Sequence, residues 1–351
     1  MAPLIAIEEH YISPLLDDGP GGQRDVIKKI FGPAVLDKLA DIGPARLQEM
    51  DKDSFAMTVL SHLPMNLEPG LCAAINDDLH AKIARRRDRY AAFALLPLRD
   101  PAAAGEELRR SVRRLGFVGA MVTNHLDDGS FFDTPRFDPF WAAAEELGVP
   151  VYLHPAYPPV DESRVNFDGD GAYGPAVAAA LGAWGWGWHS RTGLHFLRLF
   201  AAGVFDRFPR LQIVLGHMGE MLPFMLDRVI RFSADWPAAP AASAAAEAAP
   251  EGPDRGRRRG LREVWDANVW VTTSGMFSLA PMACLLRETR AERILFSVDY
   301  PFSGNGEGKG FMDELRGSGL VSEAEWEGIA WRNVKGLLKL DLAPELQGEA
   351  R

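Results

Sequence analysis

The chain has 351 residues, 47% of them hydrophobic and 25% charged, and its net charge is -10 at pH 7. The acidic balance argues against nucleic acid and against an anionic membrane surface as partners, so we expect a small-molecule partner. The two cysteines lie far apart, and there is neither a basic leader nor an apolar run of roughly 20 residues, which predicts a cytoplasmic protein without a disulfide framework or a membrane span.

Eight short runs rich in hydrophobic residues recur along the chain, and a helix-like segment follows each of them. The runs cover residues 4–10, 56–62, 90–97, 117–125, 149–155, 211–217, 268–275 and 293–301. Apolar strands that alternate with amphipathic helices indicate a parallel sheet covered on both faces, and eight such units predict an α/β fold with a single closed (β/α)8 barrel. The alternative is an open doubly wound sheet, but no GxGxxG motif follows the first strand.

Helix signals fill the segments between these runs. Residues 100–116 open on Asp100 as an N-cap, with Pro101 at the first helical position, and they close at Gly116. A second helical pattern, over residues 135–148, ends at a glycine just before the fifth run. Both patterns place a helix between consecutive strands, as a barrel of this kind requires.

Two irregular segments interrupt the pattern. Residues 172–193 are rich in glycine and tryptophan, which predicts a loop over a pocket that leads into the next helix. The segment at about 236–259 is rich in alanine, proline and arginine, and we expect a flexible surface insertion there within one domain that spans residues 1–351. A basic docking patch is the alternative interpretation of this insertion.

Ionisable side chains stand where several predicted strands end, which is where a (β/α)8 barrel carries its chemistry. They are Glu8, Glu9 and His10 at the first strand, His154 at the fifth, His217 at the sixth and Asp299 at the eighth. Because side chains alternate along a strand, Glu8 and His10 leave on one face and Glu9 leaves on the other. Glu9 is therefore expected to make a structural contact.

Glu8, His10, His154 and Asp299 together offer two carboxylates and two imidazoles, a donor set suited to Zn²⁺ or Mn²⁺. A single histidine at a strand end is more often a structural residue. Several such residues at one rim of a barrel favour a metal centre instead.

At these residues the sequence resembles the amidohydrolase superfamily, and within it the metal-dependent aromatic acid decarboxylases typified by 2,3-dihydroxybenzoate and γ-resorcylate decarboxylases, which are related to aminocarboxymuconate-semialdehyde decarboxylase. The matching stretches run in order from the first strand to the last helix. They are IAIEEH, ARLQEMD, AFALLPLRDP, LGFVGAMV, VPVYLHP, LHFLRLFAAGVFDRFPRLQIVLGHMGE, VTTSGMF and RILFSVDYPF. They cover essentially the whole chain outside the insertion.

The resemblance implies that Glu8, His10, His154 and Asp299 bind one divalent metal ion, Zn²⁺ or Mn²⁺. It also implies that His217 and Glu220, in the stretch GHMGE, are the family's histidine and its acidic partner. A glutamate in place of the first histidine of the HxH motif of other branches makes the site richer in oxygen, which favours Mn²⁺ modestly.

The reaction implied is the loss of CO₂ from a hydroxylated aromatic acid. It becomes feasible once the ring carbon that bears the carboxylate has been protonated. Our hypothesis makes Asp299 the acid, with His217 and Glu220 orienting it or relaying its proton. An aspartic acid is a poor acid at neutral pH unless its pKa is raised, and we expect the crowded carboxylates of the site to raise it.

Several positions depart from the family's pattern and bear on the substrate. Met276 follows TTSG where the family commonly has asparagine, and Arg191 stands where the family tends to have glutamate. Arg191 is a candidate for binding a second substrate carboxylate, with a structural ion pair as the alternative. His62 and Phe302 are further candidates for contact with the ring.

Two other functions remain open from the sequence. One is a metal-dependent hydrolase or hydratase on the same barrel, in which a metal-bound water attacks the substrate. The other is a catalytically inactive barrel that serves as a binding module. The resemblance further implies a homo-oligomer, either a dimer or a tetramer.

Overall fold

The computed structural model describes residues 3–236 and 259–342. The predicted insertion therefore lies outside the described residues apart from its two ends, and its nature stays a prediction. The single domain over residues 1–351 and the expected oligomer also stay predictions.

Parallel strands form two sheets in the described part of the chain, ordered β1-β2-β3 and β4-β5-β6-β7-β8. Their bounds are Leu4–Tyr11 (β1), Phe55–His62 (β2), Tyr90–Ala92 (β3), Ala120–Thr123 (β4), Val151–His154 (β5), Ile213–Leu215 (β6), Val269–Thr272 (β7) and Ile294–Leu295 (β8). Each of the eight predicted runs therefore contains a strand.

Single bridges join the two sheets at both of their edges. Ala94, just after β3, pairs with Ala120 of β4, and Glu9 of β1 pairs with Tyr300, just after β8. A backbone hydrogen bond of 2.8 Å from His10 N–H to the Tyr300 carbonyl accompanies the second bridge. The strands thus follow one another around a ring, and the fold is the (β/α)8 barrel that the strand pattern predicts.

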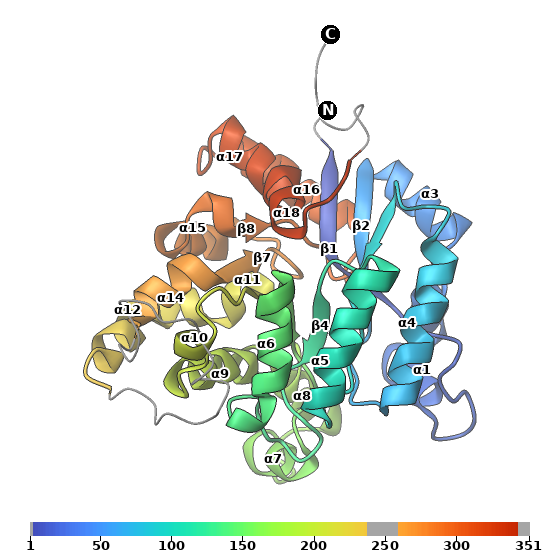
Figure 1. The fold of residues 1–351 in the computed structure, drawn as a ribbon, viewed down its shortest axis with the longest axis horizontal. Helices are drawn as coiled ribbons and strands as arrows, with labels where there is room; N and C mark the ends of the chain where they lie inside the picture. The colour runs from blue at the N-terminus through green and yellow to red at the C-terminus, as the bar shows by residue number, and fades with distance from the viewer. Residues whose placement is uncertain (1–2, 237–258, 343–351) are drawn as a thin grey trace.

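Helices surround this ring (Figure 1). The helices between β1 and β4 are α1 (Gln23–Phe31), α2 (Pro33–Ala40), α3 (Pro44–Lys52), α4 (Pro69–Ile83), α5 (Pro101–Arg110) and η1 (Ser111–Leu115). Between β4 and β7 lie η2 (Pro135–Phe137), α6 (Asp138–Leu147), α7 (Val160–Asn166), α8 (Pro175–Gly182), α9 (Gly187–Ala201), α10 (Val204–Arg207), α11 (His217–Glu220), α12 (Leu222–Ser233) and α14 (Leu261–Asn268). After β7 come α15 (Leu279–Glu288), η3 (Ala291–Arg293), α16 (Asn305–Gly317), α17 (Glu323–Glu327), η4 (Gly328–Arg332) and α18 (Asn333–Leu338).

The first two strands span the whole of the runs that predicted them, whereas β3 to β8 are shorter than theirs. The third run extends to residue 97, but β3 ends at Ala92. Beyond it, Leu95 is buried while its N–H donates to the Asn76 side chain at 3.0 Å instead of to a neighbouring strand. Phe296 after β8 likewise donates to the Ile329 carbonyl at 3.0 Å. In these six runs the hydrophobic residues therefore report burial, and only part of the run pairs as a strand.

The predicted helix boundaries at residues 100–116 are confirmed. The Asp100 carboxylate accepts a hydrogen bond of 3.1 Å from Ala103 N–H, which caps the first turn. The helix continues past Arg110 as the wider turn η1 and ends at Gly116, whose φ of 69° is in the left-handed region. Glycine adopts this conformation without the steric penalty that a Cβ brings.

The expected loop at residues 172–193 is largely helical, which corrects the prediction. The alanine-rich stretch from Pro175 to Gly182 forms α8, because proline at the first position and a run of alanines favour a helix. Helix α9 begins at Gly187, five residues earlier than expected. A short connection that includes Trp184 and Trp186 is all that remains of the loop, and both of these side chains are about half exposed.

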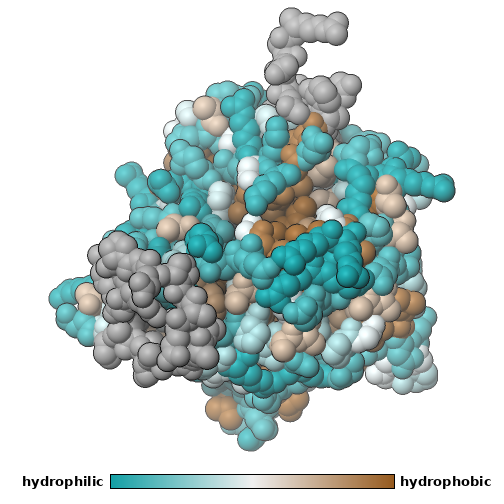
Figure 2. Space-filling view, in the orientation of Figure 1, coloured by the Kyte–Doolittle hydropathy of each residue, from teal (hydrophilic) through white to brown (hydrophobic). Residues whose placement is uncertain are grey.

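The core lies inside the ring and between the ring and the helices, and its largest fully buried side chains include Trp141 and Trp265. Each indole N–H has a partner, the Phe132 carbonyl for Trp141 and the Thr289 hydroxyl for Trp265, both at 2.9 Å. The face seen in Figure 2 is mainly hydrophilic, with hydrophobic residues showing in the middle of the view. Among the described helices, none has the length and apolar character needed to cross a membrane.

A buried histidine fixes α9 against the segment that precedes η2. His195 is fully buried, and its Nε2 accepts a hydrogen bond of 3.2 Å from Phe132 N–H. Its other ring nitrogen is buried without a hydrogen-bond partner. Burial therefore lowers the pKa of His195 from 6.5 to about 3, and the ring is neutral in the folded protein.

This buried histidine makes stability fall as the pH falls. Between pH 6.5 and about 3 the unfolded chain protonates His195 and the folded chain does not, so the folded state loses up to about 1.4 kcal/mol for each pH unit. We expect His195→Gln, whose amide oxygen can accept the same hydrogen bond, to show a shallower loss between pH 6 and pH 4. Urea unfolding at several pH values measures the two slopes, and equal slopes would contradict this assignment.

Candidate active site

Four side chains converge inside the ring from three of its strand ends. Glu8 and His10 come from β1, His154 ends β5, and Asp299 follows β8, and their donor atoms lie within 4.8 Å of one another. Glu8 Oε1 is 3.2 Å from His154 Nε2, and His10 Nε2 is 3.2 Å from Asp299 Oδ1. The structure thus brings together all four residues that the sequence predicts as metal ligands.

Glu9 points away from this cluster, as expected from strand alternation. One of its oxygens accepts a hydrogen bond of 3.3 Å from Val298 N–H, and the other is 3.8 Å from the Arg46 guanidinium. Arg46 also donates to the His10 carbonyl at 2.6 Å. Burial raises the pKa of Glu9 to about 8, although the charge of Arg46 opposes the shift. Glu9 and Arg46 therefore brace the strand that carries the two ligands.

The four-residue cluster lacks the hydrogen bonds that buried polar atoms require. Glu8 Oε1, His10 Nε2 and Asp299 Oδ1 are buried and have no hydrogen-bond partner. A buried donor or acceptor left unsatisfied costs about 1–3 kcal/mol. A divalent cation between two carboxylates and two imidazoles would satisfy all of these atoms, so the residues present fit a metal ion.

Neighbouring groups orient the ligands toward the centre of the cluster. The Tyr152 hydroxyl and the Ser274 hydroxyl both donate to Glu8 Oε2, which leaves Oε1 facing the cluster. His154 Nδ1 lies 2.7 Å from the Pro155 carbonyl, which fixes the proton on Nδ1 and leaves a lone pair on Nε2. Burial, together with the charge of Glu8, holds the pKa of Tyr152 well above its usual range, so this hydroxyl remains a donor.

A second group of ionisable side chains adjoins the first. His217 Nε2 lies 3.8 Å from Asp299 Oδ2, and His217 Nδ1 lies 2.9 Å from Glu220 Oε1. Burial disfavours the charged imidazole, but the charge of Glu220 outweighs it and raises the pKa of His217 well above 6.5. Burial likewise opposes ionisation of Glu220, yet His217 lowers its pKa to about 2. His217 and Glu220 therefore form a charged pair.

The pKa of Asp299 differs from the expected direction. Burial alone raises it, but the close contacts with the His10 and His217 rings outweigh burial and hold this pKa below its ordinary value. The two histidines thus have a stronger influence on Asp299 than the crowded carboxylates. In this state the proton of the Asp299–His217 pair resides on His217.

The segment from His217 to Met221 has an unusual backbone. His217, Met218, Gly219, Glu220 and Met221 all have positive φ values, of 48°, 54°, 89°, 53° and 66°. They form a left-handed turn, which costs roughly 1–2 kcal/mol for each residue that carries a Cβ. At Gly219 a Cβ would come within 2.8 Å of Pro223 Cδ, so only glycine fits there. The turn directs both His217 and Glu220 inward.

One of the predicted substrate contacts lies beside the cluster, and another adjoins it along the chain. The Phe302 ring is half-buried, 5.7 Å from the His10 ring and 4.8 Å from the Phe31 ring. Met276 is also half-buried and packs against the hydrophobic core. It directly follows Gly275, where a Cβ would lie 3.4 Å from His217 Cδ2.

The other two predicted contacts are occupied by the protein itself. The Arg191 guanidinium forms an ion pair with Glu162 and donates to the Gly129 carbonyl at 2.9 Å. His62 is buried, with Nδ1 2.7 Å from the Leu63 carbonyl and Nε2 accepting from Ser13 N–H at 3.1 Å. His62 thus has a partner on each ring nitrogen. In Arg191 both terminal nitrogens are engaged, and the buried Nε has no hydrogen-bond partner among the described residues.

Sequence reasoning missed Tyr152 and His189 as parts of the site. Tyr152 stands two residues before His154 on β5, so strand alternation could have placed both on the interior face. His189 lies on α9 with Nδ1 2.8 Å from Glu220 Oε2. Nothing in the spacing of His189 pointed to Glu220, because their contact depends on how α9 packs against α11.

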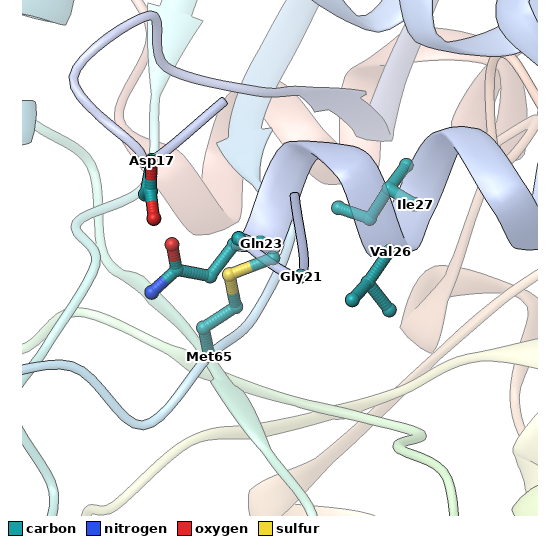
Figure 3. A pocket seen from close by; sticks show the side chains of 7 residues that line it. Asp17, Gly21, Gln23, Val26, Ile27 and Met65 are labelled. Atoms are coloured by element: carbon teal, nitrogen blue, oxygen red, sulfur yellow. The ribbon is translucent and has the colours of Figure 1, made fainter. Parts of the chain in front are cut away.

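A cleft of about 410 Å³ lies next to the barrel mouth. Gln23, Val26 and Ile27 of α1 line it together with Asp17, which follows β1, and Met65, which follows β2 (Figure 3). Met65 follows the end of β2, so the cleft is at the same end of the barrel as the metal ligands. None of the four ligand residues lines it.

Comparison with known proteins adds independent findings. The amidohydrolase family model matches residues 43–340. The chain is 46% identical over 348 residues to the decarboxylase orsB of Emericella nidulans, covering 98% of this chain and 99% of that protein. It is 36% identical to the γ-resorcylate decarboxylase of Rhodococcus jostii, covering 96% and 98% of the two chains. A crystal structure of a dihydroxybenzoic acid decarboxylase from Polaromonas, with bound manganese and the inhibitor 2-nitroresorcinol, superposes with a TM-score of 0.79 at 29% identity and covers 99% and 100%.

Removal of the Tyr152 hydroxyl tests how the Glu8 ligand is held. Tyr152→Phe deletes one donor to Glu8 Oε2 while it keeps the ring, so we expect Mn²⁺ affinity to fall about 10- to 100-fold with little change in the fold. Tyr90→Phe is the matched control, because the Tyr90 hydroxyl is buried without a hydrogen-bond partner. Calorimetric titration with Mn²⁺ measures both variants, and wild-type affinity in Tyr152→Phe would rule out this role.

Proposed function

This chain belongs to the amidohydrolase family and is a decarboxylase of a phenolic carboxylic acid, and on that premise we propose that Asp299 delivers the proton that precedes the loss of CO₂. The contact of 3.8 Å between Asp299 Oδ2 and His217 Nε2 carries this proposal. It links a carboxylate at the edge of the candidate metal site to a charged His217–Glu220 pair. No other described residue of the four-donor cluster is joined to such a pair.

The chemistry explains why a proton donor is needed. Breaking the bond between the ring and the carboxylate leaves an electron pair that the aromatic system does not readily accept. Protonation of the carbon that bears the carboxylate turns the ring into a dienone, and the bonding pair then returns to the ring as CO₂ leaves. The ortho phenolate supplies the electrons for the first step and regains them in the second.

The residues of the site divide this work among themselves. His217 stores a proton, Glu220 keeps the imidazole charged and oriented, and Asp299 passes the proton to the ring carbon. A divalent ion held by Glu8, His10, His154 and Asp299 would supply positive charge for the carboxylate and the ortho oxygen of the substrate. Phe302 and Met276 are the apolar side chains that we propose to contact the ring.

We propose that the substrate carries a hydroxyl group ortho to its carboxylate. Relatives support this choice, since one is named γ-resorcylate decarboxylase and another was crystallised with 2-nitroresorcinol. The apolar neighbours of the site, Met276 and Phe302, favour a flat aromatic ring over an aliphatic acid.

Decarboxylation in D₂O tests the proposal. With γ-resorcylate as the substrate, we expect release of one CO₂ for each ring and one deuterium at the ring carbon that bore the carboxylate. Headspace analysis measures the CO₂, and proton NMR of the phenolic product locates the deuterium. A hydrolase or a hydratase would give neither signal, so their absence across a panel of ortho-hydroxy aromatic acids would refute the proposal.

Asp299→Asn is the control for the role of the acid. It removes the carboxylate that passes the proton from His217 to the ring and keeps one oxygen, so we expect kcat to fall by at least about 100-fold while some metal remains bound. Metal content measured on the same sample separates loss of the acid from loss of the ion. Near wild-type turnover in this variant would exclude Asp299 as the proton donor.

We also propose Mn²⁺ rather than Zn²⁺ as the resident ion. Two carboxylates make the donor set rich in oxygen, which Mn²⁺ tolerates well, and the Polaromonas relative binds manganese. After removal of metal with a chelator, we expect Mn²⁺ to restore more activity than Zn²⁺ does. Equal or greater recovery with Zn²⁺, confirmed by elemental analysis of the reactivated protein, would reverse the choice.

A further inference from the structure

Glu220 is shared between two histidines from different elements. Its Oε1 lies 2.9 Å from His217 Nδ1, and its Oε2 lies 2.8 Å from His189 Nδ1. His189 comes from α9, whereas His217 and Glu220 belong to the left-handed turn. The His189 and His217 rings also lie close together, with centroids 4.7 Å apart.

His189 has a second partner on its other nitrogen. Its Nε2 lies 3.1 Å from the Trp184 carbonyl, in the short connection between α8 and α9. Both partners are acceptors, because a carbonyl has no proton and Glu220 is ionised. Through its two ring nitrogens, His189 therefore joins Glu220 to the connection between α8 and α9.

The packing of α9 leaves little freedom at this contact. One turn after His189, Gly193 faces the same turn, and a Cβ there would come within 2.7 Å of the Glu220 carbonyl. The helix backbone thus lies directly against Glu220. Both oxygens of Glu220 and both ring nitrogens of His189 have hydrogen-bond partners. These two residues therefore differ from the four-donor cluster, in which three buried atoms have no such partner among the described residues.

We propose that His189 is a positioning residue for proton transfer, which holds the Glu220 carboxylate so that Glu220 in turn holds His217 toward Asp299. This inference rests on the proposed function, because it assigns His189 to the same proton path. His189 does not touch any of the four candidate metal ligands in the contacts recorded for it. It acts through Glu220 and His217, and so stands furthest from the substrate in the series of side chains that ends at Asp299.

The two hydrogen bonds of His189 can be tested separately. An asparagine amide nitrogen can occupy the position of Nδ1 and retain the donor to Glu220. A glutamine amide nitrogen can occupy the position of Nε2 and retain the donor to the Trp184 carbonyl. If His189 positions Glu220, kcat should decrease in the order wild type, His189→Asn, His189→Gln.

We expect His189→Gln to lower kcat by about 10- to 100-fold while KM changes by less than about twofold, because the lost contact affects proton transfer and not substrate binding. His189→Asn should retain kcat within about fivefold of wild type. Ser190→Ala is the matched control on the same helix, since its hydroxyl only contacts the Gly187 carbonyl, at 3.2 Å. Mn²⁺ content and the thermal unfolding midpoint are measured for every variant.

The reverse order, with His189→Gln more active than His189→Asn, would overturn the proposal and assign His189 to holding the connection at Trp184. Wild-type kcat in both variants would also overturn it. Nitrogen NMR of the histidine side chains gives a readout that does not depend on turnover: in the proposed arrangement His189→Gln changes the Nδ1 signal of His217, and His189→Asn changes it less. Inactivity of the wild-type protein toward all ortho-hydroxy aromatic acids would instead refute the proposed function, and the NMR result would still decide the role of His189.

Discussion

Three buried ligand atoms without hydrogen-bond partners, on Glu8, His10 and Asp299, are the constraint on which the rest of the site depends. Burying such atoms costs free energy that folding alone does not recover, so the surrounding structure has to hold them in place until a cation neutralises them. The barrel does so by closing its ring next to them, where Glu9 pairs with Tyr300. The hydroxyls of Tyr152 and Ser274 hold Glu8 by its other oxygen, Oε2, so that Oε1 faces the cluster.

Two kinds of buried polar group therefore lie side by side at this end of the barrel. In one, donor atoms face one another without hydrogen bonds, which suits a cation. In the other, Glu220 contacts His217 through one oxygen and His189 through the other, an arrangement that suits the storage and transfer of a proton. Asp299 belongs to both groups through its two oxygens. In the proposed mechanism, this position lets one carboxylate connect substrate orientation with protonation.

Much of this arrangement could be predicted from the sequence because a parallel barrel collects its strand ends at one edge. Alternation along β1 separated Glu8 and His10 from Glu9, and the later strand ends supplied His154 and Asp299. His189 could not be predicted, because its contact with Glu220 depends on the packing of a helix against a turn. The ion pair of Arg191 could not be predicted either, since its partner Glu162 lies on the separate helix α7. Local patterns thus identified the four residues that converge, and tertiary packing decided which side chains surround them.

The left-handed turn from His217 to Met221 has a consequence for protein engineering. Residues three apart also share a face in a right-handed helix. The backbone there has the opposite handedness, however, so an H-x-x-E motif in an ordinary helix would not reproduce the geometry of the His217–Glu220 pair. The positive φ values of this turn also lower the stability of the folded protein, so relieving one of them should raise it. Met221, with φ of 66° and a half-buried side chain, is a position where glycine relieves conformational strain without altering either functional side chain. A substitution that raises the thermal stability of this barrel can therefore be sought within the left-handed turn itself.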